Sequence, residues 1–327
     1  MKAVVYTQYG SPDVLTLSEI EQPSLNDDQV LVKVHATSVT TGDVNVRNFV
    51  FVANGFKTIS RLMFGYNKPK KHVLGVEFAG EVVGIGDDVK KFKVGDAVFG
   101  IDGFGMGAYA EYKAISENKG VAHKPINLTY QEAVGIPNGT LTAFTFLHKL
   151  GKVQPGEKVL VVGASGSVGS AGVQIAKYLG AEVTGVCSGR NVDLVKTLGA
   201  DHVIDYTQTD FTQGNEKYDV IFDTVNNTRF AKCKSVMNRG GRFLVGAGGP
   251  LAFLQMARTA LFGSKKIISG MSSESQADLT FIKELVEQGH IQPVIDRSYA
   301  MADMAEAHRY VDTGRKRGNV VINIVPA

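Results

Sequence analysis

Cysteine is scarce in this sequence, since Cys187 and Cys233 are the only two among 327 residues. Two cysteines cannot build a disulfide framework or a cysteine-rich zinc site, which both need more thiols. Neither sign of charge is in large excess, because the formal net charge is +3, and no long basic run occurs. The sequence gives nucleic-acid binding little support, and we expect no nucleic-acid partner.

Long apolar runs are also missing. The first residues, MKAVVYTQYGSPDVL, lack the uninterrupted apolar core of a signal peptide. No segment approaches the roughly 20 consecutive apolar residues that a membrane-spanning helix needs. We therefore expect no membrane span and a cytoplasmic location.

The composition that remains is typical of a compact α/β protein. Apolar residues make up 44% and charged residues 20%, with 37 glycines, which excludes a disordered or fibrous chain. A chain of 327 residues fits two domains of ordinary size.

The pattern changes along the chain. Residues 1–125 are mostly short β-branched stretches separated by turns, which predict a β-rich domain. From Val159 onward, short apolar strands alternate with helical stretches, which predicts a parallel, doubly wound sheet. Two amphipathic helical stretches and a closing strand, GNVVINIV, end the sequence, and this strand is a candidate to rejoin the first domain.

The stretch KVLVVGASGSVGSAGVQIAKYLG predicts a strand, a glycine turn and a helix in succession. Glycines at such a turn let the backbone approach a pyrophosphate, while the helix N-terminus points free N–H groups at it. The context of further strand–helix units predicts a nucleotide site. Its cofactor-binding residues in the turn are Ala164, Ser165, Gly166, Ser167, Val168 and Gly169.

The end of the next strand indicates which cofactor binds. An NAD site usually has Asp or Glu there, whereas the 2′-phosphate of NADP needs a cation and small donors. This chain has Ser188, Gly189 and Arg190, with no carboxylate before Asp193, and Tyr206 ends the following strand. We predict NADPH, contacted by Ser188, Arg190 and Tyr206; the alternative for Arg190 is an ordinary surface cation.

Five separated stretches resemble the medium-chain dehydrogenase/reductase superfamily in the right order: LGVEFAGEVVGIGDDVKKFKVGDAVFG, GAYAEYKAI, IPNGTLTAFTFL, GASGSVGSAGVQIAK and LGADHVIDY. Within it, the sequence is most similar to the zinc-independent, zeta-crystallin-like quinone oxidoreductases. The resemblance implies a GroES-like, β-rich catalytic domain and a Rossmann domain with a doubly wound parallel sheet. We assign residues 1–125 and 266–327 to the first domain and 126–265 to the second.

The resemblance also implies NADPH-dependent reduction of a small electrophile, a quinone or an α,β-unsaturated carbonyl, commonly by a homodimer. The candidate catalytic residues that it suggests are Thr40, Asn45 and Asn138. The same resemblance adds Asp43 and Arg47 as pocket candidates and Thr142 and Gly246 as cofactor-binding residues. For two of them a structural role is the alternative, Asp43 as the cap of a helix starting at Val44 and Arg47 as the partner of a surface acid.

Zinc-dependent relatives place two Cys and one His around the reacting oxygen. The matching positions here look like Thr40, Val76 and Asn138, and Thr and Asn are poor zinc ligands while Val is none. Glu77 remains beside Val76, but one carboxylate does not make a metal site. The seven histidines are scattered without ligand spacing. We expect no metal.

Two other functions stay open from the sequence: a non-catalytic NADPH-binding or sensor protein, and a zinc-dependent alcohol dehydrogenase. The sequence also leaves two possible roles or more for each of three segments. Residues 49–72 are a basic, amphipathic stretch that we interpret as a lid, with a partner or membrane surface as alternatives. Residues 246–263 either line the cleft or pack a dimer partner, and the cations at 315–317 either reach the cofactor phosphate or are solvated.

Overall fold

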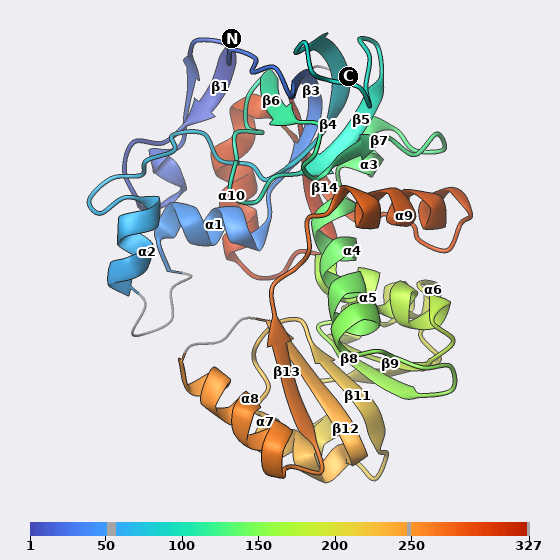
Figure 1. Ribbon diagram of the computed structural model, residues 1–327. Coiled ribbons are helices and arrows are strands. Elements are labelled where there is room, and N and C mark those ends of the chain that lie inside the picture. The colour runs from blue at the N-terminus through green and yellow to red at the C-terminus, as the bar shows by residue number, and fades with distance from the viewer. Residues whose placement is uncertain (51–56, 247–249, 326–327) are drawn as a thin grey trace. The chain divides into compact units, whose positions relative to one another are not determined.

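The computed structural model describes residues 1–50, 57–246 and 250–325 (Figure 1). It divides the chain into two compact units, one made of residues 1–138 and 274–327 and the other of residues 139–273. Residues 51–56 of the predicted lid and 247–249 of the apolar stretch lie outside the described residues.

The boundaries differ from those predicted, because residues 126–138 belong to the first unit and residues 266–273 to the second. Residues 266–270 form strand β13 (Lys266–Gly270), which pairs in parallel with β12 (Met237–Gly246) and so extends the second sheet. Helix α3 (Tyr130–Ala133) packs against strands of the first unit. The side-chain amide of Asn127 donates to the Val286 carbonyl oxygen at 3.1 Å.

The first unit is built on a seven-stranded sheet in the order β14-β15-β3-β4-β5-β7, with β6 also paired to β3. A two-stranded ladder of β1 (Lys2–Val5) and β2 (Thr16–Glu19) stands apart from it. The seven strands are β3 (Gln29–Ser38), β4 (Glu77–Ile85), β5 (Ala97–Ile101), β6 (Tyr112–Ser116), β7 (Val121–His123), β14 (Ile295–Ala300) and β15 (Asn319–Asn323). The closing strand β15 pairs antiparallel with β3, as the sequence pattern suggested.

The helices of the first unit flank this sheet. They are α1 (Thr41–Asn48), α2 (Lys57–Phe64), α3, α9 (Gln276–Glu287) and α10 (Met304–Asp312). Helices α1 and α10 contact each other although about 260 residues separate them in the chain, as the 261-residue spacing of Arg47 and His308 records. The core is apolar and dominated by valine, with Phe78, Leu74 and Ile115 fully buried.

The second unit has a six-stranded sheet in the order β10-β9-β8-β11-β12-β13, with every pair parallel. Its remaining strands are β8 (Lys158–Val162), β9 (Glu182–Cys187), β10 (His202–Asp205) and β11 (Tyr218–Asp223). The strand order turns back between β8 and β11, which is where open α/β sheets bind their ligands. The predicted α/β class, a GroES-like domain plus a Rossmann domain, is confirmed.

Helices cover the faces of this parallel sheet. They are α5 (Ser167–Tyr178), α6 (Val192–Thr197), α7 (Phe230–Cys233) and α8 (Pro250–Phe262), and α8 lies beside β13 (Figure 1). Helix α4 (Pro137–Phe144) begins in the first unit and continues into the second. Strand β8 has four consecutive buried residues after Lys158, which is expected for a strand covered on both faces. Among the residues that the structure places, every helix is too short or too polar to cross a bilayer.

Candidate functional site

The turn from β8 into α5 has the shape of a phosphate cradle. Gly163 has φ +78°, and the Gly163 and Ala164 amides both donate to the Val186 carbonyl oxygen at 3.0 Å. A Cβ added to Gly169 would lie 2.0 Å from the Gly163 carbonyl oxygen, so no side chain fits there. Glycine at 163 and 169 is therefore a requirement of the turn itself.

The N-terminus of α5 lacks a side-chain cap. Its N-cap is Gly166, which supplies no side-chain cap, so the first N–H groups of the helix have no intrahelical or side-chain partner. Ser167 Oγ is buried and has no hydrogen-bond partner among the described residues. Unpaired N–H groups and a hydroxyl at a helix N-terminus suit a phosphate.

The predicted 2′-phosphate residues follow neighbouring parallel strands. Ser188 comes after β9 and Tyr206 after β10, and the Tyr206 amide donates to the Cys187 carbonyl oxygen at 3.0 Å. Because the two strands are parallel, their carboxyl ends share one edge of the sheet. Arg190 and Tyr206 are both exposed at this edge. The arrangement supports these three positions, which stay predictions.

Asn191 is a residue that the sequence analysis missed. It is buried, and its side-chain amide donates to Ser165 Oγ at 3.0 Å and to Ser188 Oγ at 3.2 Å. The Asn191 Oδ1 atom has no partner within the described part of the chain. Asn191 thus ties the glycine turn to the end of β9, and in the sequence it is indistinguishable from an ordinary residue at the start of a helix.

Two further cofactor positions were predicted by resemblance. Gly246 ends β12 at the same edge of the sheet, and its carbonyl oxygen accepts a hydrogen bond from Ser269 Oγ at 3.0 Å. Thr142 is half-buried on α4. Nothing in their surroundings tests a contact with a cofactor.

In the first unit, Thr40 and Asp43 form a capping box. Helix α1 begins at Thr41, so Thr40 is the N-cap and the expected helix start at Val44 is three residues late. The Thr40 amide and hydroxyl donate to Asp43 Oδ2 at 2.9 and 2.6 Å, and the Asp43 amide donates back to Thr40 Oγ1 at 3.1 Å. The Thr40 hydroxyl hydrogen is therefore engaged inside the protein. The half-buried Asn45 lies on the same helix.

A buried polar chain connects Asp43 to α10. The Asp43 carboxyl raises the pKa of the Tyr109 hydroxyl together with burial, and this hydroxyl lies 3.0 Å from His308 Nε2. Arg47 donates to His308 Nδ1 at 2.9 Å and to Asp312 Oδ2 at 2.8 Å. Burial, reinforced by Arg47, lowers the pKa of His308 to about 3, so the imidazole is neutral. Arg47 pairs with an acid, as its structural alternative proposed, but the guanidinium is fully buried and holds two helices together.

Glu77 joins two segments that contain predicted catalytic residues. Its carboxylate is fully buried, with Oε1 accepting from the backbone N–H of Asn138 at 2.7 Å and Oε2 accepting from Ser38 Oγ. Ser38 ends β3, two residues before Thr40, and Asn138 lies at the start of α4. Burial raises the pKa of Glu77 to about 7, although the Ser38 and Asn138 hydrogen bonds oppose this rise.

The cations at 315–317 differ in how far they are exposed and in what they contact. Lys316 Nζ donates to the Gly318 carbonyl oxygen at 2.7 Å, and burial lowers the pKa of Lys316 to about 8 while Glu77 and Asp296 favour its charge. Arg317 is half-exposed and donates to Asp296 Oδ1 at 3.3 Å. Lys316 is therefore a half-buried charge that bonds to its own segment, which neither sequence-based alternative described.

The positions that would match zinc ligands are used otherwise. The Thr40 hydroxyl caps α1 and Val76 packs against the apolar core, while at position 138 the backbone N–H donates to Glu77. Within the described ranges, no three His, Cys, Asp or Glu side chains come close enough to hold a metal ion. Cys187 and Cys233 are both buried, and burial raises the pKa of each thiol, to about 11 and about 12. Neither cysteine has the character of a nucleophile.

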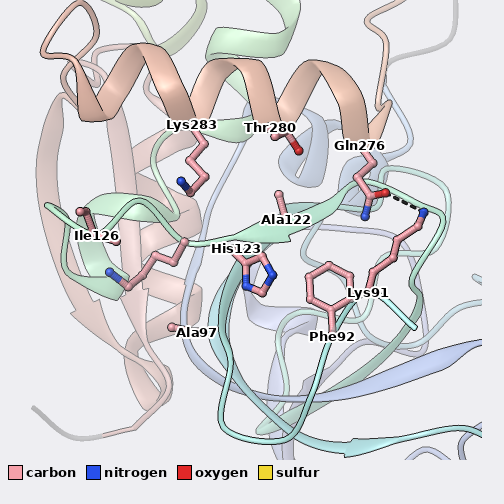
Figure 2. Close-up of a pocket in the computed structure, with 10 residues that line it drawn as sticks. Lys91, Phe92, Ala97, Ala122, His123, Ile126, Gln276, Thr280 and Lys283 are labelled. Atoms are coloured by element: carbon pink, nitrogen blue, oxygen red, sulfur yellow. Dashed lines mark hydrogen bonds between the residues drawn. The ribbon is translucent and has the colours of Figure 1, made fainter. Parts of the chain in front are cut away.

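A cavity of about 610 Å³ lies between α9 and β7, away from the Glu77 cluster (Figure 2). Its three lysines have partners in the protein. Lys91 donates to Gln276 Oε1 at 2.8 Å, Lys283 pairs with Glu287 at 2.7 Å, and Lys124 donates to the Pro125 carbonyl oxygen at 2.9 Å. The cavity therefore does not offer an obvious anion site.

Comparison with known proteins agrees with this geometry. Residues 26–126 match a family model described as alcohol dehydrogenase GroES-like domain, and residues 198–322 match one described as zinc-binding dehydrogenase. The chain is 35% identical to 2-methylene-furan-3-one reductase of Solanum lycopersicum, over all of this chain and 80% of that protein.

Two further similarities extend over nearly the whole chain. The chloroplastic NADPH-dependent alkenal/one oxidoreductase of Arabidopsis thaliana is 32% identical, over 100% of this chain and 80% of that one. The solved structure of the quinone oxidoreductase from Coxiella burnetii superposes with a TM-score of 0.88 at 28% identity, over 99% of each chain.

Proposed function

The chain belongs to the medium-chain dehydrogenase/reductase superfamily, as a quinone oxidoreductase-like member, and we propose that it reduces quinones or α,β-unsaturated carbonyls with NADPH and without a metal ion. The family and an oxidoreductase that uses a nicotinamide cofactor are confirmed, as predicted. The single observation that carries the proposal is the β8–α5 turn, where a Cβ at residue 169 would collide with the Gly163 carbonyl oxygen. Such a turn suits a pyrophosphate.

The preference for NADPH is supported by the residues that follow β9. Ser188 and Arg190 offer a hydroxyl and a cation where an NAD site usually has a carboxylate. The nearest carboxylate is Asp205, which lies close to Gly189, and its Oδ1 accepts from the Thr207 amide and hydroxyl at 2.9 and 2.8 Å. Only Oδ1 is used within its own turn, whereas Oδ2 is the oxygen closest to Gly189. Arg190 supplies the cation that a 2′-phosphate needs at this edge.

When bound, NADPH supplies the hydride, and the residues of this chain hold the acceptor and stabilise the negative charge on its carbonyl oxygen. The Thr40 hydroxyl donates to Asp43 at 2.6 Å, so this hydrogen is not available to the acceptor. The amide side chains of Asn45 and Asn138 are therefore the better candidates for the donor. Zinc-free polarisation is supported by what Thr40 and Val76 do in the fold.

Association into a homodimer is part of the proposal and is supported by the second unit. Strand β13 is at the edge of its sheet, where backbone groups are left for pairing with another chain. Leu254, Leu261 and Phe262 on α8 are 68%, 75% and 86% exposed. Light scattering after size exclusion tests this: Phe262→Glu with Leu261→Glu lowers the mass from two chains to one. A wild-type monomer at micromolar concentration contradicts it.

The acceptor of the hydride is a small molecule, a quinone or an α,β-unsaturated carbonyl. A cytoplasmic location stays a prediction, because one of the relatives is named as chloroplastic. A fractionation experiment with the untagged chain in its own cells decides the location.

The reaction is tested with the full chain after dialysis against a chelator. NADPH and NADH consumption is measured with a simple quinone and a simple enone as acceptors. Turnover that prefers NADPH and is unchanged by added zinc is the expected result. Activity that returns only with zinc identifies an alcohol dehydrogenase type of chemistry, and tight NADPH binding with no turnover on any acceptor identifies a binding protein.

A further inference from the structure

Asn191 occupies a position where an asparagine usually caps a helix, but its side chain makes no cap. It is the N-cap residue of α6, and no hydrogen bond joins its side chain to the first N–H groups of that helix. An N-cap asparagine normally accepts such a bond with Oδ1, which stabilises the helix. Here Oδ1 is buried and has no partner among the residues that the structure places. Asn191 therefore lacks the stabilising contact of its position, which is typical of a residue with a functional role.

The amide nitrogen of Asn191 has two partners instead. Nδ2 donates to Ser165 Oγ at 3.0 Å and to Ser188 Oγ at 3.2 Å. A primary amide carries two hydrogens, so both bonds form at the same time. Ser165 lies in the turn between β8 and α5, and Ser188 follows β9. Asn191 thus connects two segments that were both predicted to contact the cofactor.

The direction of these hydrogen bonds determines where the serine hydroxyls point. A serine oxygen that accepts from an amide directs its own hydrogen elsewhere. Over the described ranges, neither hydroxyl donates to a protein group. Ser165 and Ser188 are both half-buried, so a ligand can reach them. The structure therefore presents two O–H donors at the edge of the sheet where β8 and β9 end.

We propose that Asn191 is a positioning residue for cofactor selectivity, which holds both serine oxygens as acceptors and so turns two hydroxyl donors toward the 2′-phosphate of NADPH. The inference rests on the proposed function, because it takes this edge of the sheet as the place of the 2′-phosphate. A phosphate oxygen only accepts, so its binding depends on donors that point at it. The ribose 2′-hydroxyl of NADH both donates and accepts, and it gains less from two fixed donors.

The nearest acid explains why the direction of the hydroxyls matters. Asp205 Oδ2 lies 2.6 Å from the place that a Cβ on Gly189 would take, so a carboxylate is present at the same edge. A carboxylate repels a phosphate and accepts from a ribose hydroxyl, which favours NADH. Donors fixed at Ser165 and Ser188 act in the opposite direction, together with the cation of Arg190.

The first test measures selectivity without turnover. Titration calorimetry gives the Kd of the full chain for NADPH and for NADH, which differ only in the 2′-phosphate. Asn191→Leu keeps a side chain branched at Cγ and removes both hydrogen bonds. We expect NADPH to bind about tenfold more weakly, while the Kd for NADH stays within about twofold of the wild type. An unchanged ratio of the two Kd values in Asn191→Leu overturns the inference.

The second test asks whether Asn191 acts through the two serines. Ser165→Ala combined with Ser188→Ala removes both hydroxyl donors and is expected to weaken NADPH about tenfold or more, with little change for NADH. Adding Asn191→Leu to this pair should change the Kd for NADPH by less than about twofold, because no hydroxyl is left to orient. Losses that multiply show that Asn191 acts on its own and contradict a positioning role.

The matched control is Asn238→Leu. Asn238 is a half-buried asparagine of the same unit, and its side-chain amide donates at 2.7 Å to Asp219, near the amino end of β11. This variant is expected to lower stability and to leave the ratio of the two Kd values unchanged, as a purely structural residue would. Thermal melts show which variants fold. Asn191→Ala, with the same expected ratio, replaces Asn191→Leu if the larger side chain prevents folding.

The outcomes separate this inference from the proposed function. A wild type that prefers NADPH, with the same ratio of Kd values in Asn191→Leu, contradicts only the role of Asn191. A wild type that binds both cofactors equally contradicts the proposed preference for NADPH, and the inference is overturned with it. A selective loss of NADPH binding in Asn191→Leu, in a protein that turns over neither acceptor, supports the inference and contradicts the proposed reaction.

Discussion

The two units of this protein carry chemistry in different ways. In the second unit the site is a backbone shape, since Gly163 and Gly169 form a turn that no side chain fits. In the first unit the site is a set of buried charges, with Glu77 and Arg47 both fully buried. A backbone shape is encoded by neighbouring residues, whereas a charge cluster draws on residues as far apart as Arg47 and His308, 261 positions along the chain.

The largest expected effect distinguishes two arginines. Arg47→Met removes a buried guanidinium that binds His308 and Asp312, and we expect it to cost about 3 kcal/mol of unfolding free energy. Arg190→Met removes an exposed guanidinium and is expected to change stability by less than about 0.5 kcal/mol. Urea unfolding measures both. Similar losses in the two variants contradict the contrast between the units.

A smaller loss is expected in the glycine turn. Gly169→Ala places a Cβ 2.0 Å from the Gly163 carbonyl oxygen, and we expect a loss of roughly 2 kcal/mol together with weaker NADPH binding. Gly166→Ala is the matched control for stability, because its Cβ meets nothing closer than 3.5 Å and its φ is −79°. Thermal melts and fluorescence titration with NADPH measure the two effects. Wild-type stability in Gly169→Ala is the result that excludes a tight turn.

The choice of cofactor is a still more local property of the second unit. Arg190→Ala is expected to weaken NADPH binding about 10- to 100-fold, because a charge-assisted hydrogen bond to the 2′-phosphate contributes roughly 1.5–3 kcal/mol. NADH binding should change little. Lys196→Ala, which removes another exposed cation nearby, serves as the control. Titration calorimetry decides, and an equal loss for both cofactors argues against a contact with the phosphate.

The smallest effect compares two capping boxes of the first unit. Thr40 caps α1 with Asp43, and Thr129 caps α3 with Glu132 in the same geometry on the surface. Thr40→Ala and Thr129→Ala are each expected to cost about 1 kcal/mol of stability. Only Thr40→Ala should also lower kcat, since Thr40 lies beside the Glu77 cluster. Equal kcat values in the two variants place Thr40 outside the pocket.

The sequence predicted what is local. The glycines at the β8–α5 turn, the missing acid after β9 and the parallel sheet could be recognised because strand and helix periodicity surrounds them. Asn191 could not, since only the fold brings its amide to Ser165 and Ser188. The same holds for the partners of Arg47, because His308 and Asp312 lie 261 and 265 residues away along the chain.

The boundaries between the units were also beyond sequence reasoning. Residues 266–270 continue the parallel sheet as its sixth strand, but a short strand carries no mark of the sheet that it joins. The start of α1 was placed late because Thr40 and Asp43 are both acceptable caps, and only the reciprocal hydrogen bonds show which residue takes which position.

The most direct test of the central claim follows the hydride. Chelator-treated protein is given NADPH that carries deuterium at the transferable position of the nicotinamide ring, together with a simple enone. The account predicts one deuterium at the β-carbon of the saturated ketone, at a rate that added zinc does not change. Deuterium that stays on the cofactor, or that is transferred only after zinc is added, contradicts metal-free hydride transfer by this chain.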